Sequence, residues 1–152
     1  MEGLIEMAMN DVKIRLENVT KDFATPKGDL RVIDGLDFSV VAGESVAVVG
    51  PSGSGKTTLL NLLAGLDKPT GGRVLVDGKP IDGPSPQRGV IFQQYAVFPF
   101  LTVLENAVFG LTLRANHKPH EERLAIARRY LHLMGLSAFE DAYPKTLSGG
   151  MK

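Results

Sequence analysis

Eight consecutive residues combine the side chains and the backbone freedom that a phosphate site needs. They are Gly50-Pro51-Ser52-Gly53-Ser54-Gly55-Lys56-Thr57, which match the pattern G-x-x-x-x-G-K-[ST]. Glycines let backbone N–H groups turn toward phosphate oxygens, and a helix that begins after them adds its positive N-terminal end. Lys56 would place its ammonium on the β- and γ-phosphates, and the Thr57 hydroxyl would coordinate Mg²⁺. The pattern predicts a triphosphate site, in which we also include Thr58.

The segments on both sides of this loop have the periodicity that the motif requires. Val46–Val49 is apolar without alternation, which is typical of a strand buried on both faces of a parallel sheet. Residues 57–65 are helical in pattern, and Gly65 is placed to end the helix. Val90–Phe92 predicts another short buried strand. A glycine-rich turn without a ligand is the plainer alternative, and the strand–loop–helix order argues against it.

Other strands are expected to have one exposed face. Val12–Leu16 and Leu36–Val40 alternate apolar and polar residues, which favours an antiparallel sheet near the N-terminus. Arg73–Val76 is followed by Asp77-Gly78, which indicates a strand that ends in a turn.

Beyond residue 100 the pattern becomes helical. Thr102 and Glu105 have the spacing of a capping box, which predicts a helix from Thr102 to about Leu113. A second helix is expected over residues 121–134, with Gly135 as its stop. Its apolar face is expected to contain Leu124, Ala127, Leu131 and Met134.

Composition narrows the class of protein. The 152 residues carry 17 Lys and Arg against 17 Asp and Glu, and 43% are hydrophobic, so we expect a folded domain. A net charge of zero argues against nucleic-acid binding, which needs surplus cations. The absence of cysteine suits a reducing cytoplasm. The acidic start and the lack of a long apolar run predict a soluble chain that reaches a membrane only through a partner.

A second motif distinguishes among the proteins that use such a loop. No Asn-Lys-x-Asp pattern occurs, which excludes a GTPase, whereas the loop alone would also suit a small-molecule kinase. The sequence Leu147-Ser148-Gly149-Gly150-Met151 places Ser148 92 residues beyond Lys56. Its hydroxyl and its bare glycine N–H groups suit an anion. Ser-Gly-Gly alone is a common turn, but at this distance from the loop the motif resembles the signature of ATP-binding cassette (ABC) ATPases.

The resemblance implies roles for further residues. Gln93, directly after Phe92, would reach Mg²⁺ and the attacking water and be catalytic together with Lys56; its neighbour Gln94 competes for this role. Phe23 lies where the family places an aromatic ring against adenine, although a core phenylalanine is an alternative. The apolar segment 95–101 either docks membrane subunits, as in the family, or packs in the core.

Two further stretches narrow the resemblance to one group of importers. Asp77–Val90 and Phe139–Pro144 are similar to the ATPases of importers for nitrate, sulfonate, taurine and related solutes. The implied fold is α/β: a P-loop NTPase (RecA-like) core over about 43–100, an antiparallel β portion over 11–42 and the start of a helical subdomain over 101–152. Together these would form an incomplete ABC nucleotide-binding domain.

The same resemblance implies partners and location. The protein would be a homodimer that binds ATP and Mg²⁺, in which the signature of one subunit caps the γ-phosphate on the other. It would lie on the cytoplasmic face of the membrane, against transmembrane permease subunits, and a solute-binding protein would act indirectly. No nucleic acid is expected.

The chain stops at Lys152, before two parts that the family uses for hydrolysis. These are a strand that ends in Asp-Glu and a later histidine, and His117, His120 and His132 all precede the signature. We therefore expect these 152 residues alone to be marginally stable and nearly inactive. A non-catalytic nucleotide-binding fragment and a soluble ABC-type ATPase of DNA repair or translation are the alternatives, and co-purification with a membrane subunit would separate the latter from a transporter.

Overall fold

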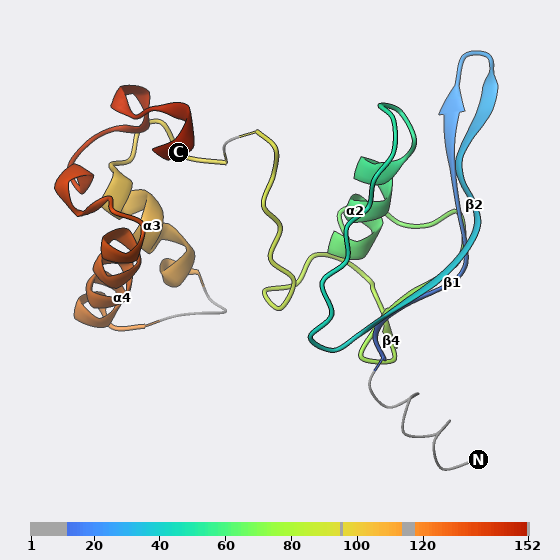
Figure 1. The fold of residues 1–152 in the computed structure, drawn as a ribbon, viewed down its shortest axis with the longest axis horizontal. Coiled ribbons are helices and arrows are strands. Elements are labelled where there is room, and N and C mark those ends of the chain that lie inside the picture. Colours follow the sequence, from blue (N-terminus) through green and yellow to red (C-terminus); the bar gives the residue numbers. More distant parts are fainter. Residues whose placement is uncertain (1–11, 95, 114–117, 152) are drawn as a thin grey trace, which may run out of the picture. The chain divides into compact units, whose positions relative to one another are not determined.

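The computed structural model describes residues 12–94, 96–113 and 118–151. The chain divides into two compact units, Met1–Val90 and Ile91–Lys152, and each is described by itself (Figure 1). The phosphate loop belongs to the first unit, and the signature motif belongs to the second.

The first unit is built on a four-stranded antiparallel sheet in the order β2-β1-β3-β4. Two long strands, β1 (Val12–Thr25) and β2 (Gly28–Val41), form a hairpin. The short strands β3 (Gly71–Val76) and β4 (Lys79–Pro80) continue the sheet beside β1, joined through Asp77 and Gly78. The predicted antiparallel strands and the predicted turn are therefore confirmed.

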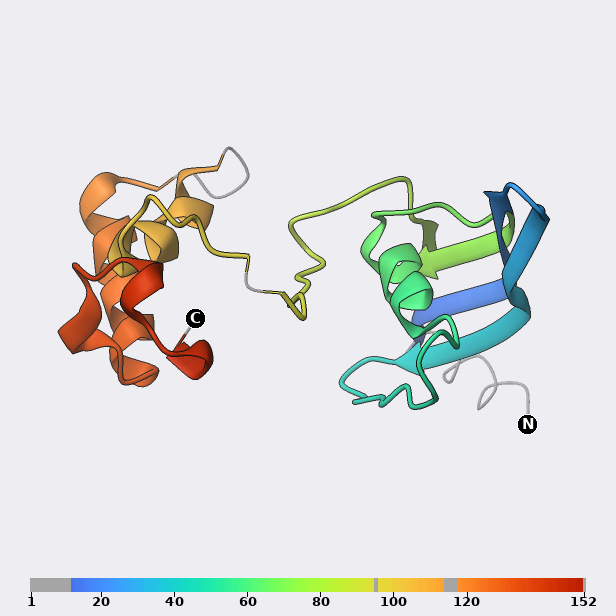
Figure 2. The ribbon, with the colours of Figure 1, turned by 90° about the horizontal axis from the view of Figure 1, so that it is seen from above.

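One helix, α2 (Lys56–Ala64), packs against this sheet (Figure 2). Leu62 of α2 is buried in one cluster with Leu16 and Val19 of β1, together with Ile33 and Val74. The helix ends at Gly65, as predicted, because the left-handed backbone there (φ 76°) is open to glycine without steric cost. Burial of Leu62 against the sheet fixes the helix, and with it the loop from which the helix begins.

The two buried parallel strands predicted from Val46–Val49 and Val90–Phe92 are not formed. Both segments are irregular, and their side chains are exposed, to 88% at Val49 and 100% at Ile91. A strand needs a neighbour for its N–H and C=O groups. In the described part of the chain every strand pairs within the antiparallel sheet, so neither segment has a parallel partner. The prediction of burial was therefore wrong for both segments, because the partner strand that burial requires is not among the described residues.

In its described residues, the second unit has two helices and three short 3-10 turns. Helix α3 (Val103–Thr112) begins at the predicted capping box: the Glu105 N–H donates to Thr102 Oγ1 at 3.2 Å, and the Thr102 N–H donates to Glu105 Oε2 at 2.7 Å. Helix α4 (His120–Leu133) also matches its prediction and is followed by Gly135 at φ 71°. The 3-10 turns cover Ser137–Phe139, Pro144–Thr146 and Gly149–Met151.

The core of the second unit is formed by one residue each from α3, α4 and the signature motif. Val103 of α3, Leu131 of α4 and Leu147 are buried together. Ala127 is buried as predicted for α4, whereas Met134 is 74% exposed, because the helix ends one residue before it. None of the helices in the described ranges has the length and apolar composition needed to cross a membrane.

Candidate functional site

The structure describes every residue of the predicted phosphate loop, Gly50–Thr58, and places it at the start of α2. Gly53 and Gly55 both adopt positive φ, at 81° and 85°, so the glycines of the motif provide the turns for which they were singled out. Thr57 lies exposed in the first turn of the helix. The loop therefore delivers its lysine and its threonine to the positive end of a helix.

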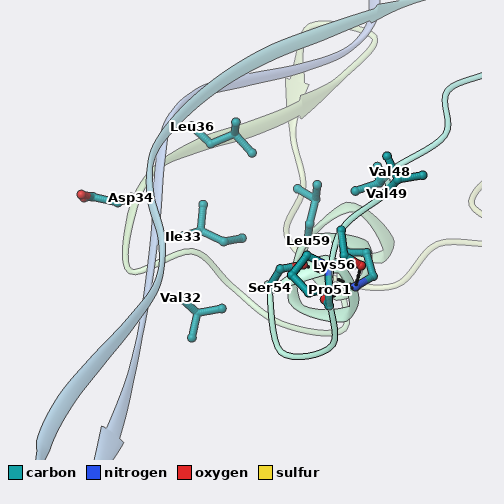
Figure 3. Close-up of a pocket in the computed structure, with 12 residues that line it drawn as sticks. Val32, Ile33, Asp34, Leu36, Val48, Val49, Pro51, Ser54, Lys56 and Leu59 are labelled. Atoms are coloured by element: carbon teal, nitrogen blue, oxygen red, sulfur yellow. Dashed lines mark hydrogen bonds between the residues drawn. The ribbon is translucent and has the colours of Figure 1, made fainter.

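The Lys56 ammonium is turned back over its own loop. Its Nζ donates to the carbonyl oxygens of Gly50 at 2.9 Å and of Pro51 at 2.7 Å, with Ser54 Oγ at 3.4 Å (Figure 3). These oxygens are the neutral counterparts of the phosphate oxygens that a lysine binds in such a loop. The ammonium is thus already held at the centre of the loop.

A hollow of about 390 Å³ opens beside the loop. Val32, Ile33 and Leu36 of β2 face it from one side, and the loop faces it from the other (Figure 3). Asp34, on the same strand, points away from it. Val49 and other apolar residues beside the loop line it as well, so the hollow is largely apolar, with the polar groups of the loop on one side. Its size is that of a small-molecule site. The sequence prediction missed the β2 residues, although the apolar pair Val32-Ile33 within a strand was a signal for them.

Phe23 lies on β1, where its ring is more than one-third exposed. Lys21 Nζ lies over this ring, 4.9 Å from its centroid, in a cation–π contact. Phe23 is not among the residues that line the hollow. The ring is not enclosed as a core phenylalanine would be, and its stacking on adenine stays a prediction.

Two ion pairs hold the elements around the site. Lys21 Nζ bonds to Asp67 Oδ1 at 2.6 Å, which joins β1 to the segment that follows α2, and this hydrogen bond lowers the pKa of Asp67. Arg31 of β2 bonds to Asp22 of β1 at 2.9 Å, and this hydrogen bond lowers the pKa of Asp22. Both carboxylates therefore favour the ionised form.

The glutamine candidates lie in the second unit. Gln93 and Gln94 are both exposed in an irregular bend, so the choice between them stays open. Tyr95, the first residue of the predicted apolar segment, lies outside the described residues. Farther along that segment Phe100 is 71% exposed, and the Phe98 ring packs at a tilt against Phe109 of α3 with centroids 4.5 Å apart. Phe100 therefore does not pack in the core.

The signature motif has one buried residue, three exposed ones and the half-buried Met151, which packs against the same core as Leu147. Leu147 is buried against Val103 and Leu131, whereas Ser148, Gly149 and Gly150 are exposed. The Met151 N–H donates to the Ser148 carbonyl at 3.1 Å within the last 3-10 turn. The motif is anchored through its leucine and presents the serine and the glycines to solvent.

Within the described ranges no group of three His, Asp or Glu residues is arranged to hold a metal ion. The predicted magnesium ligands, Thr57 and Gln93, would not form such a cluster. A magnesium ion at a phosphate loop takes most of its ligands from phosphates and water, so few protein ligands are needed. Thr57 has an exposed hydroxyl at the loop, which fits this role.

Comparison with known proteins agrees with this geometry. The family model described as ABC transporter matches residues 33–152. An uncharacterized ABC transporter ATP-binding protein of Methanocaldococcus jannaschii is 49% identical over 93% of this chain and 52% of its own length. The nitrate import ATP-binding protein NrtD of Synechocystis sp. is 42% identical over 91% of the chain and 52% of its length. The bicarbonate transport ATP-binding protein CmpD of the same organism is 42% identical over 91% of the chain and 49% of its own length.

Solved structures give the same result. An ATP-binding cassette in a dimeric post-hydrolysis state, bound to ADP and Pi, matches with a TM-score of 0.78 and 33% identity over 91% of this chain and 64% of its own. The fold is therefore that of the α/β P-loop NTPases. The chain spans about half the length of the curated relatives named above. On its sequence and its structure, the chain belongs to the ABC transporter family.

Proposed function

We propose that this chain is part of the ATP-binding, ATP-hydrolysing subunit of an ABC importer. The observation that carries the proposal is the phosphate loop at the start of α2, with the Lys56 ammonium held over it by Gly50 and Pro51. ATP would lie with its phosphates on the backbone N–H groups of the loop residues that follow Pro51, up to Thr58. Lys56 would exchange two neutral carbonyl oxygens for charged phosphate oxygens, which makes the exchange favourable.

The remaining residues of the site have separable roles in this proposal. The Thr57 hydroxyl would hold Mg²⁺, and the Gln93 amide would orient the attacking water beside it. Phe23 would contact adenine. The magnesium ion, when bound, would neutralise charge that develops on the phosphates during hydrolysis. Positioning and charge account for most of the catalysis in phosphoryl transfer, so each of these residues acts by placing a group.

Two copies would complete each ATP site. The exposure of Ser148–Gly150 supports this arrangement, because these residues are free to meet a γ-phosphate bound to a second subunit. The solved relative that is a dimer bound to ADP and Pi supports it as well. The three-part division of the chain into residues 11–42, 43–100 and 101–152 belongs to the same proposal.

The transported solute is proposed from the relatives. Two of them are named for nitrate import and for bicarbonate transport, which supports a small oxyanion. A sulfonate such as taurine stays in the proposal through the resemblance in sequence alone. The subunit would act at the cytoplasmic face of the membrane with transmembrane permease subunits, and a solute-binding protein would deliver the solute to them. The exposed Phe100 supports a docking role for its segment.

A pair of variants in the full-length product of the gene tests the site. Lys56→Ala removes the charge at the loop and is expected to abolish ATP binding. Ser148→Arg changes only the signature, and is expected to leave ATP binding within about twofold while preventing ATP-dependent dimer formation. The measurements are equilibrium binding of a fluorescent ATP analogue and light scattering for the dimer. Equal loss of ATP binding in both variants would contradict the arrangement in two copies.

A further inference from the structure

Asn106 of α3 makes more hydrogen bonds than any other amide side chain in the described residues. Its Oδ1 accepts from the Phe98 N–H at 2.8 Å. Its Nδ2 lies at donor distance from the carbonyl oxygens of Phe98 (3.1 Å), Leu101 (3.0 Å) and Thr102 (2.9 Å). One half-buried side chain therefore holds a loop of four residues, Phe98–Leu101, to the first two turns of a helix.

An aromatic contact is the second interaction that holds this loop against α3. The Phe98 ring packs in a tilted arrangement against Phe109, one turn farther along α3 than Asn106, at 4.5 Å between centroids. Phe100, whose ring centroid lies 5.8 Å from that of Phe98, remains 71% exposed. The loop is thus held on α3 through Phe98 and leaves Phe100 exposed.

The start of α3 is joined in turn to the residues that precede the signature. The Val103 N–H donates to the Ala142 carbonyl at 2.9 Å, and the Leu104 N–H donates to the Glu140 carbonyl at 3.0 Å. These are N–H groups that a helix start leaves without an intrahelical partner. Val103 also packs on Leu147, the buried anchor of the signature. Asn106 and Leu147 both line one small hollow of about 140 Å³ in this core.

We infer that Asn106 is a positioning residue that couples the Phe98–Leu101 loop to the signature motif. A force on Phe100 would pass through Asn106 to α3, and from the start of α3 to Leu147 and Ser148. Without the amide, the loop would move on its own, and a partner bound to Phe100 would no longer move the signature. The inference rests on the proposed function, because it takes a permease subunit as the partner that presses on Phe100.

The test uses the full-length product of the gene, assembled with its permease. Asn106→Ala removes all four contacts and is expected to lower permease-dependent stimulation of ATP hydrolysis at least tenfold. Basal hydrolysis and ATP affinity should stay within twofold, because neither the loop at Lys56 nor the exposed Ser148 is touched. Thr102→Ala is the matched control: it weakens the same end of α3 but leaves the backbone carbonyl to which Asn106 donates. In Thr102→Ala, stimulation of ATP hydrolysis by the permease should stay within twofold of the wild-type value.

A spectroscopic measurement reports on the loop directly. The 152 residues contain no cysteine, so a spin label at Phe100→Cys marks one position in this part of the protein. The label should move faster in the Asn106→Ala background than in the Thr102→Ala background. Unchanged label mobility overturns the inference, and so does equal loss of stimulation in the two variants or a collapse of basal hydrolysis in Asn106→Ala.

Failure of the proposed function would look different. A wild-type assembly that shows no stimulation by a permease would contradict the transport role itself. The label would still decide whether Asn106 holds the loop, because that measurement requires neither a permease nor hydrolysis.

Discussion

Val32 fills the space that a side chain on Gly55 would need. A Cβ added to Gly55 would lie 3.0 Å from Val32 Cγ1 and 3.2 Å from the Val32 carbonyl oxygen, and Gly55 has a φ of 85°. The last glycine of the phosphate loop is therefore pressed against β2. The shape of the loop depends on a strand that lies more than 20 residues earlier in the chain.

This contact predicts a difference between two glycine variants. Gly55→Ala adds both backbone strain and an unusually tight contact with Val32, whereas Gly53→Ala adds strain alone, because nothing lies within 4 Å of its added Cβ. We expect Gly55→Ala to weaken ATP binding about tenfold more than Gly53→Ala does, which corresponds to about 1.4 kcal/mol. Titration calorimetry with ATP measures both. Equal affinities would show that the contact with β2 does not shape the loop.

The capping box at the start of α3 predicts a modest loss of stability. Thr102→Ala removes the acceptor of the Glu105 N–H and should lower the free energy of unfolding by about 1 kcal/mol. Thr102→Ser keeps the hydroxyl and should lower it by less than half as much. Urea unfolding followed by circular dichroism compares the three proteins. A serine variant as unstable as the alanine variant would exclude the hydroxyl as the cause.

The Lys21–Asp67 pair predicts a pH-dependent contribution to stability. The hydrogen bond from Lys21 lowers the pKa of Asp67 below its ordinary value of 3.8, so the folded state favours the ionised carboxylate. The stabilisation is therefore present above about pH 4 and is lost as the pH falls through the lower folded-state pKa. Asp67→Asn should lower the melting temperature at pH 7, by an amount equivalent to about 1 kcal/mol or less, and should have a smaller effect near pH 3.

A second carboxylate serves as the control for this prediction. Asp29 is exposed and forms no ion pair in the described part of the chain. Asp29→Asn should change the melting temperature little at either pH. A pH-independent effect of Asp67→Asn would mean that the amide disturbs packing rather than the ion pair.

The exposed apolar segments predict the behaviour of the 152-residue polypeptide by itself. Val49 and Ile91 present their side chains to solvent, which favours binding of the dye ANS and self-association. We expect strong ANS fluorescence, a broad thermal transition and very slow magnesium-dependent ATP hydrolysis. The double variant Val49→Thr and Ile91→Thr should reduce the fluorescence. A sharp transition together with turnover at an enzyme-like rate would refute this expectation.

Features set by neighbouring residues could be predicted from the sequence. Three such features are the capping box of Thr102 and Glu105, the end of a helix at Gly65, and the start of that helix directly after the glycine-rich loop. Each depends on residues within a few positions, and each was placed correctly. Alternation also identified the antiparallel strands. These signals are local because a cap, a turn and one exposed face need no distant partner.

Features that depend on distant partners could not be predicted. The apolar run Val46–Val49 indicates a buried strand. Burial of that strand requires a neighbouring strand, however, and the structure leaves the run exposed. The packing of Val32 on Gly55 needs the fold of the hairpin to be known first. The four contacts of Asn106 are invisible in sequence, because an asparagine in a helix is most often a surface residue.

In the signature motif a buried leucine is followed directly by an exposed serine. Mutations at these two residues should therefore cause two different kinds of genetic defect. Lesions at Leu147 would remove packing from the core of the second unit, so their phenotype should be temperature-sensitive and should be relieved by second-site changes that refill the core near Val103. Lesions at Ser148 leave that core intact, so cold growth conditions should not rescue them. Mutations in two adjacent codons would then fall into different classes in one genetic selection.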